Sequence, residues 1–292
     1  EKKSSAFAVI IIFVLLVLIL LFFIKAKTRV WNGSDKASIV YPGADGYISV
    51  TILDPAASEI ITLIIPSETQ VDVARNYGTL RIKNVWQLGV NEKIGGRLLA
   101  ETVTKNFLFP VFLWTSKDPG YESGNAMTIL SFVFFPGNTN IAFGDRLRMG
   151  IFSMNTANID RTEIDLGKSR FLDKKVLTDG EPGYVSGGEI SQRLTVYFSD
   201  ARIEKANVKV NITDATGTAG VSEKLGKILQ VMGGKVVSVN KKSEAENIDC
   251  VVSGTNREAV KKIVDLFSCK GENLGSSFDL DIKIGKNFAG RF

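Results

Sequence analysis

The feature that constrains this chain most is an uninterrupted apolar run from Ala6 to Ile24. It holds no charged residue, amide, glycine or proline, and about 20 such residues span the hydrocarbon core of a bilayer as a helix. In lipid, a lone segment takes the helical form because its backbone has to be satisfied internally. A buried core helix and a cleaved signal peptide are the alternatives, but the run is long for a signal core and no A-x-A site follows it. We therefore expect residues 1–29 to form a transmembrane anchor with its flanks.

Composition excludes several classes of site. The net charge of +5 and the pI near 9.0 are modest, and no basic stripe with interleaved aromatic residues appears, so we expect no nucleic-acid partner. Histidine is absent, which removes the commonest metal ligand. The two cysteines do not form a C-x-x-C pair, so a structural zinc site is excluded. We expect no metal and no cofactor.

The charges that flank the apolar run do not fix its orientation. Lys2 and Lys3 precede it, and Lys25, Lys27 and Arg29 follow it, so the positive-inside count is nearly balanced. The later group also suits lipid phosphates on the outer face. Orientation has to be inferred from other parts of the sequence.

The chain after the anchor is predicted to hold a linker and two α/β domains. Residues 30–46 are rich in Gly, Pro, Ser and Asp, which is typical of an irregular connector. Residues 47–205 then combine β-rich runs with helical patterns and form the first predicted domain. Its expected elements are strands at 47–53 and 59–65, a helix at 92–108, a strand at 111–114, a buried apolar element at 126–135, a strand at 162–167, a loop-rich stretch at 171–188 and a short helix at 189–200.

Residues 206–292 form the second predicted domain. Strands are expected at 208–213, 235–240, 247–254 and 278–285, with one helix after the turn at 217–220 and another that begins after Thr255 as N-cap. This order is β-α-β-β-α-β, which indicates a ferredoxin-like sheet of four strands with two helices on one face. The predicted fold class is thus a single N-terminal transmembrane helix followed by two α/β domains.

The second domain resembles the C-terminal domain of the LytR family. The strand VKVNIT, the turn DATGTAG, the helix that ends in MGG and the closing IKIGKNFAG all fall in that pattern. Within the turn, Gly217 and Gly220 carry the match. Such domains belong to envelope proteins on the outer side of bacterial membranes. The resemblance therefore implies a single-pass protein of the cytoplasmic membrane whose folded domains lie on the extracytoplasmic side.

The first domain is similar in layout to the LytR-CpsA-Psr domain, in a degenerate form. Where that family has Pro-Arg-Asp-Thr after the second strand, this chain has Pro66, Ser67, Glu68 and Thr69. The next family segment has a basic residue, Ile, a small residue and an aromatic residue before paired glycines. The similar positions here are Arg81, Ile82, Asn84, Trp86 and Gly89, and a helix with Gly95 and Gly96 follows. The later stretch that helps to hold a lipid-linked pyrophosphate has its nearest counterparts in Arg146 and Arg148, which do not align well.

The resemblance implies a chemistry that this chain lacks residues for. Family members transfer glycan from a polyprenyl pyrophosphate to cell-wall polymer, with Arg and Asp binding the pyrophosphate and its metal. Arginine pairs phosphate bidentately, and Ser67 cannot replace it. We therefore expect an inactive relative with no catalytic residues. Glu68, Arg81, Lys83 and Arg97 remain candidate anion-binding residues, with ordinary solvated charges as the alternative.

The predicted function is a membrane-anchored binding or scaffold module. Its candidate partners are the lipid bilayer, cell-wall glycan, a polyprenyl-linked precursor and another envelope protein. One alternative is a phosphotransferase that moves glycan from a polyprenyl pyrophosphate carrier and uses Glu68 with Arg81 or Arg97. Another is a structural subunit that assembles through its span, although the span lacks small-xxx-small spacing. Arginines that converge on a pocket at Glu68 would favour the enzyme.

Cys250 and Cys269 are a candidate disulfide. Cys250 is near the start of a predicted strand, and the helix that follows runs back to the level of that start. An oxidising compartment would let the pair form, provided that the helix unwinds by Ser268. Two separate buried thiols are the alternative.

Overall fold

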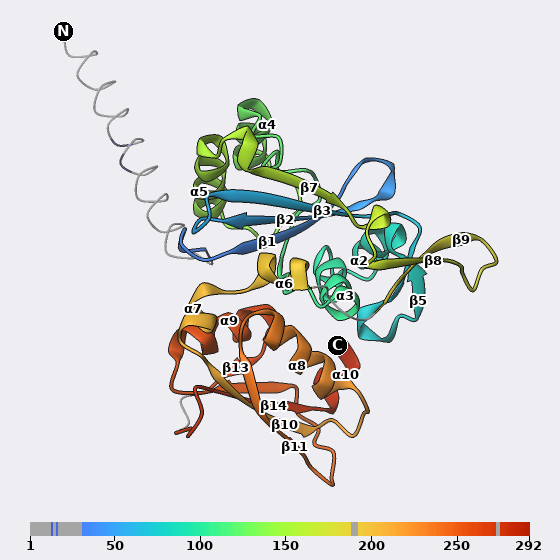
Figure 1. Ribbon diagram of the computed structural model, residues 1–292, viewed down its shortest axis with the longest axis vertical. Coiled ribbons are helices and arrows are strands. Elements are labelled where there is room, and N and C mark those ends of the chain that lie inside the picture. Colours follow the sequence, from blue (N-terminus) through green and yellow to red (C-terminus); the bar gives the residue numbers. More distant parts are fainter. Residues whose placement is uncertain (1–12, 14–15, 17–30, 188–191, 273–274) are drawn as a thin grey trace.

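The computed structural model describes residues 13, 16, 31–187, 192–272 and 275–292 (Figure 1). The predicted transmembrane run lies outside these residues, except for Phe13 and Leu16, which are helical and exposed. No helix in the described part of the chain is long and apolar enough to cross a membrane. The anchor at residues 1–29 therefore stays a prediction.

A five-stranded mixed sheet forms the centre of the first domain, by which we mean β1 to α6. Its strands run in the order β6 (Leu113–Trp114), β1 (Ala37–Pro42), β2 (Ile48–Asp54), β3 (Glu59–Ile65) and β7 (Arg161–Asp165). β1, β2 and β3 pair antiparallel, whereas β6 and β7 add to the two edges in parallel. All seven residues of β2 are buried, because helices cover both faces of the sheet.

Helices form a layer on each face of this sheet (Figure 1). One layer holds α4 (Ala126–Phe134) and α5 (Phe143–Asn155), and the other holds α2 (Val85–Asn91), α3 (Arg97–Phe107) and α6 (Gln192–Phe198). Along β1, the alternation of side chains sends Ile39 and Tyr41 into the core under α4 and α5, and Val40 into the core on the other face.

A smaller sheet extends from one end of the first domain. Its order is β5 (Thr79–Arg81), β4 (Thr69–Asp72), β9 (Pro182–Ser186) and β8 (Leu172–Val176). The hairpin β8–β9 occupies much of the stretch that was predicted to be loop-rich, and Gly180 takes a positive φ of 83° in its turn. Short 3-10 turns lie at η1 (Ala44–Gly46), η2 (Ala74–Asn76), η3 (Ile82–Asn84), η4 (Asn158–Asp160) and η5 (Leu166–Lys168).

The C-terminal domain, by which we mean α7 to α10, has its own five-stranded sheet. The strand order is β11 (Lys235–Lys241), β10 (Lys209–Ala215), β14 (Leu280–Gly285), β12 (Cys250–Ser253) and β13 (Lys270–Gly271). Helices α8 (Val221–Val231) and α9 (Arg257–Phe267) cover the face that is turned to the first domain, and α7 (Ala201–Lys205) and α10 (Lys286–Arg291) flank them (Figure 1).

The ferredoxin-like arrangement is not confirmed. In a split β-α-β unit another strand separates the two connected strands, but β10 pairs directly and in parallel with β11. The chain after α9 first adds the short strand β13 beside β12, and only then inserts β14 between β10 and β12. The order of long elements was predicted correctly, but this extra strand was missed.

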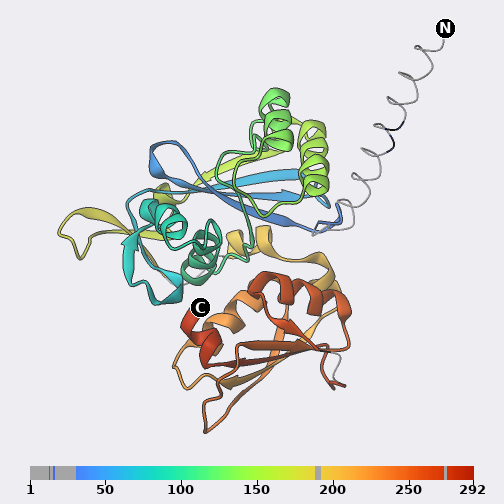
Figure 2. The same cartoon turned by 180° about the vertical axis from the view of Figure 1, so that it is seen from behind.

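The two domains share one continuous apolar core. The rings of Phe109 and Phe198 stack with centroids 4.5 Å apart, and both belong to the same buried cluster as Met232 and Leu266 of the C-terminal domain. The C-terminal helix α10 also reaches the first domain, where the Asn76 side chain donates to the carbonyl of Gly290 over 3.2 Å (Figures 1 and 2). The junction is therefore a packed interface.

Three local predictions were wrong for identifiable reasons. The linker predicted at 30–46 contains β1, a buried strand between β2 and β6, whose short apolar core is hidden among turn-forming residues. The helix predicted from 92 begins at Arg97, because Lys93 and Gly95 take positive φ. The cap of α9 is Asn256, whose side chain accepts from the Ala259 N–H at 3.1 Å, and not Thr255.

Candidate functional site

Three of the four candidate anion-binding residues meet at the β4–β5 hairpin. Glu68 directly precedes β4, Arg81 ends β5, and Lys83 lies in η3. The Lys83 ammonium group is 2.5 Å from the Glu68 carboxylate, and the Arg81 guanidinium group forms an ion pair with its other oxygen. The hydrogen bond from Lys83, together with the one from Arg81, holds the pKa of Glu68 below its usual value. This carboxylate is therefore ionised at neutral pH.

A second carboxylate completes this cluster. Asp179, in the turn between β8 and β9, lies 2.7 Å from the Arg81 guanidinium group. Its own pKa is lowered, first by the backbone N–H of Glu181 and then by Arg81. Sequence reasoning missed Asp179 because the hairpin that carries it was predicted to be loop. Both cations of the cluster thus already face carboxylates of the same chain.

Arg97 lies apart from the Glu68 cluster. Its guanidinium group is 2.8 Å from Glu101, one turn further along α3. Glu101 also pairs with Arg75, at 2.6 Å. Because a single carboxylate holds both guanidinium groups, the structure does not bring Arg97 to Glu68. Within the described ranges, no group of three or more His, Cys, Asp or Glu side chains is placed to hold a metal ion.

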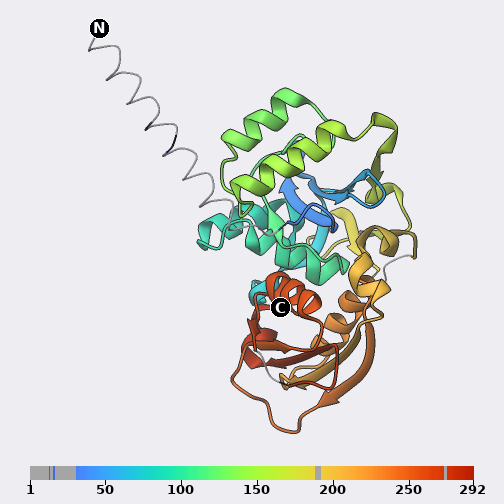
Figure 3. The same cartoon turned by 90° about the vertical axis from the view of Figure 1, so that its left-hand side faces the viewer.

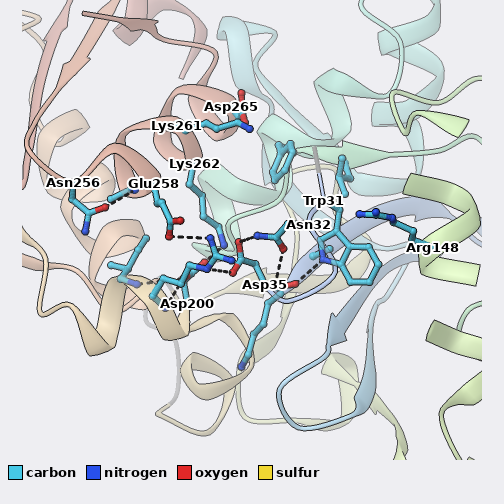
Figure 4. Close-up of a pocket in the computed structure, with 17 residues that line it drawn as sticks. Trp31, Asn32, Asp35, Arg148, Asp200, Asn256, Glu258, Lys261, Lys262 and Asp265 are labelled. Carbon is cyan, nitrogen blue, oxygen red and sulfur yellow. Dashed lines mark hydrogen bonds and ion pairs between the residues drawn. The ribbon is translucent and has the colours of Figure 1, made fainter. Parts of the chain in front are cut away.

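A cavity lies at the junction of the two domains (Figure 4). Its volume is about 430 Å³, within the range of small-molecule sites, which often lie between domains. The segment before β1, the strand β6 and helices α5, α7 and α9 all contribute to it. The described lining residues are Trp31, Asn32, Asp35, Lys36, Ala37, Phe112, Leu113, Arg148, Asp200, Arg202, Ile203, Asn256, Glu258, Ala259, Lys261, Lys262 and Asp265. We call this cavity the junction pocket.

Arg202 of α7 ties the two sides of the junction pocket together. Its guanidinium group lies 2.7 Å from the Asp35 carboxylate and 2.9 Å from that of Glu258 on α9. The turn that presents Asp35 is local: the Asn32 side chain accepts from the backbone N–H groups of Ser34 and Asp35, each at 3.0 Å. This wall is therefore a fixed network of charges.

Lys262 is a largely buried cation of the junction pocket, with a side chain that is 23% exposed. Its ammonium group donates to the carboxylate of Asp200, which is itself only 4% exposed (Figure 4). Burial lowers the pKa of Lys262 to about 8, and the negative charge of Asp35 opposes that shift. Asp200 also caps α7, as its carboxylate accepts from the N–H groups of Arg202 and Ile203.

Two further cations face the junction pocket from opposite domains. Arg148 extends from α5 and Lys261 from α9 (Figure 4), and neither forms an ion pair with another residue that the structure describes. The side chains of Trp31 and Phe112 form an apolar part of the pocket wall, between the charged groups. Of the described lining residues none is Ser, Thr, Cys or His, so the pocket offers charged groups, asparagine amides and apolar surface.

Sequence reasoning did not find the junction pocket. Its residues come from segments around positions 31, 112, 148, 200 and 260, so no short motif contains two of its walls. One usable signal was Asp200 before the helical pattern of α7, a typical N-cap, although a cap alone does not indicate a ligand site. The Trp31 to Asp35 segment was assigned to the linker.

Comparisons with known proteins give only a distant likeness. No family model and no curated protein matches the sequence. Among solved structures, the chain is similar to TagV of B. subtilis, with 11% identity and a TM-score of 0.39 over 70% of this chain and all of that one. It is also similar to the transcriptional regulator yvhJ of Bacillus subtilis, with 13% identity and a TM-score of 0.35 over 52% of this chain and 89% of that one.

A third similar structure is the LytR-CPS2A-psr family protein YwtF (TagT), which was solved with bound octaprenyl pyrophosphate lipid. Its identity is 10% and its TM-score 0.26, over 77% of this chain and 83% of that one. At such identities and scores the likeness carries no argument about ligand or activity.

Proposed function

We propose that this chain is a membrane-attached envelope protein that acts by binding and does not transfer a glycan. The observation that carries this proposal is the pairing of its candidate phosphate-binding cations. Arg81 and Lys83 both face Glu68, Arg81 also faces Asp179, and Arg97 faces Glu101. A pyrophosphate would have to displace these carboxylates before it gained a cation. The described lining of the junction pocket includes none of the cations Arg81, Lys83 and Arg97.

The junction pocket is the binding site in this proposal. It combines apolar surface at Trp31 and Phe112 with the cations Arg148 and Lys261 and with carboxylates that accept hydrogen bonds from hydroxyl groups. A ligand with both sugar hydroxyls and an anionic group suits this lining. Cell-wall glycan and a polyprenyl-linked precursor have that chemistry, and an envelope protein that presents a charged loop is the third candidate.

The membrane attachment and the extracytoplasmic location belong to the same proposal. The apolar run at 6–24 supports attachment. The disulfide between Cys250 and Cys269 supports an oxidising compartment. Protease added to intact spheroplasts should digest residues 31–292, and digestion only after lysis would contradict the location.

An assay with the full chain separates binding from transfer. The purified protein in detergent is given a polyprenyl pyrophosphate and Mg²⁺, and both ligand retention and phosphate release are measured. We expect retention without release, and weaker retention in Arg148→Ala, with Arg170→Ala as a control outside the pocket lining. Phosphate release that disappears in Glu68→Ala would instead establish the phosphotransferase.

A further inference from the structure

Helix α4 exposes an apolar face that nothing in the described structure covers. Met127, Leu130 and Phe134 follow one another at helical spacing and are 77%, 43% and 59% exposed, and Phe135 directly after the helix is 74% exposed. The opposite face is fixed to the core through Ile129, Phe132 and Val133. The stretch at 126–135 was predicted to be a buried element, and this prediction is wrong for the outer face of α4. An apolar surface of this kind marks an interaction site.

The surroundings of this face are suited to lipid. No charged residue occurs from Ser123 to Gly144, a stretch that includes all of α4. The neighbouring helix α5 adds Ile151 and Met154, which are 46% and 41% exposed. Figures 1 and 3 show α4 and α5 at the end of the molecule that lies away from the C-terminal domain. The apolar face thus lies at one pole of the body.

The path of the chain places α5, the helix beside α4, near the predicted anchor. The Trp31 ring packs edge-on against Phe152 of α5, with centroids 6.1 Å apart, and the backbone N–H of Trp31 donates to the Asp145 carboxylate at 3.3 Å. The apolar run ends at Ile24. Even when fully extended, the residues between Ile24 and Trp31 reach roughly 25 Å. If the run crosses a bilayer, α5 therefore lies close to the membrane surface.

We propose that the outer face of α4, made of Met127, Leu130, Phe134 and Phe135, rests in the interfacial layer of the bilayer. This inference rests on the membrane attachment in the proposed function. Large apolar side chains on one face of a helix bind that layer, and the lack of charge on α4 removes the main penalty for entry. The contact holds the first domain against the membrane and directs the C-terminal domain away from it.

Lipid-quenching of site-specific labels tests the contact. The full chain is placed in nanodiscs at one copy per disc, with an environment-sensitive fluorophore on one engineered cysteine, and spin-labelled phospholipid is titrated in. Three variants are compared: Leu16→Cys in the predicted span, Phe134→Cys on α4, and Val176→Cys on the β8–β9 hairpin as a control, since Val176 is also 74% exposed. Cys250 and Cys269 are joined in a disulfide and do not take the label.

We expect quenching of at least two-fold at positions 16 and 134 and none at 176. Adding Met127→Glu and Leu130→Glu to the Phe134→Cys variant should abolish quenching at 134. The same two changes in the Leu16→Cys variant should leave quenching at 16 unchanged.

Quenching at 16 without quenching at 134 overturns the α4 contact and leaves attachment intact. Quenching at 134 alone refutes the span but supports the contact. Equal quenching at 134 and 176, or energy transfer between α4 labels of two copies in detergent, overturns the contact.

Discussion

The carboxylate of Asp200 and the ammonium group of Lys262 form an ion pair that joins the segment between the domains to helix α9. The same carboxylate caps α7 by accepting from two backbone N–H groups. Its side chain is 4% exposed and that of Lys262 is 23% exposed, so solvent screens the pair only slightly. One side chain thus fixes two elements that line the junction pocket.

The first prediction concerns Asp200→Asn, which keeps the cap and removes the negative charge. At pH 6.5 we expect the free energy of unfolding to fall by about 3 kcal/mol, because Lys262 stays charged without its partner. Burial lowers the pKa of Lys262 to about 8, below the value near 10.4 of an unfolded lysine. Between about pH 8 and 10 the unfolded chain therefore keeps a proton on Lys262 that the folded chain has released. The free energy of unfolding rises with pH over this range.

The loss in Asp200→Asn should therefore be smaller at pH 9 than at pH 6.5, as measured by urea unfolding of the full chain in detergent. Glu258→Gln is the matched control, since its carboxylate is 66% exposed and its pair with Arg202 contributes under about 1 kcal/mol. Equal losses from Asp200→Asn at both pH values would show that the charge of Lys262 is not responsible.

The second prediction concerns Glu68→Gln. This change removes the carboxylate that neutralises Lys83 and leaves Arg81 with Asp179. We expect measurable binding of inorganic pyrophosphate at low ionic strength by isothermal titration calorimetry, against none for the unchanged protein. Stability should change by less than about 1 kcal/mol, because these side chains are partly exposed. Glu92→Gln serves as the control, since among the described residues the Glu92 side chain accepts from the Tyr77 hydroxyl alone. Equal binding by the unchanged protein would contradict internal neutralisation.

The third prediction uses a pair of carboxyl groups in the first domain. Burial, together with the neighbouring Glu163, raises the pKa of Glu122 to about 7. The folded chain therefore holds a proton that the unfolded chain releases at lower pH, and stability falls as pH rises from about 4.5 to 7. Glu163→Gln should flatten this fall and raise the free energy of unfolding at pH 7.5 by about 1–2 kcal/mol. Glu59→Gln, at the exposed start of β3, should follow the unchanged protein across a pH series of urea titrations.

The sequence predicted those parts of the fold that depend on local pattern. Strand β3 and helices α8 and α9 were found because their apolar residues recur with the period of the element. The same pattern does not say how many neighbours an element has. Helix α4 is apolar on every side, which suggests complete burial, yet its packing against the sheet, α5 and Tyr121 leaves Phe134 exposed.

The candidate site divides in the same way. Glu68, Arg81 and Lys83 lie close together in the sequence on one hairpin, so a local motif was enough to predict that they form one group. Asp35, Arg202 and Glu258 meet only through the packing of two domains. No spacing rule connects such distant positions, and the junction pocket could not be predicted without the tertiary structure.

The last prediction concerns the disulfide between Cys250 and Cys269, whose Cα atoms lie 4.9 Å apart. Cys250 begins β12, and Ser268 ends α9 in the left-handed conformation, which turns Cys269 back toward that strand. The bond closes a loop between residues 19 apart in the sequence. A loop of this size contributes about 3 kcal/mol by restricting the unfolded chain. The double variant Cys250→Ala with Cys269→Ala should therefore unfold at lower urea concentration.

Reductant should lower the stability of the unchanged protein toward that of the double variant and should leave the variant itself unaltered. Because cytosolic thiols are kept reduced, protein taken from cells under alkylating conditions also reports the compartment. We expect mass spectrometry of the unreduced digest to show one linked peptide pair that contains both cysteines. Two separately alkylated cysteine peptides would contradict both the bond in the cell and the oxidising location, since Cys250 and Cys269 are already within bonding reach in the folded chain.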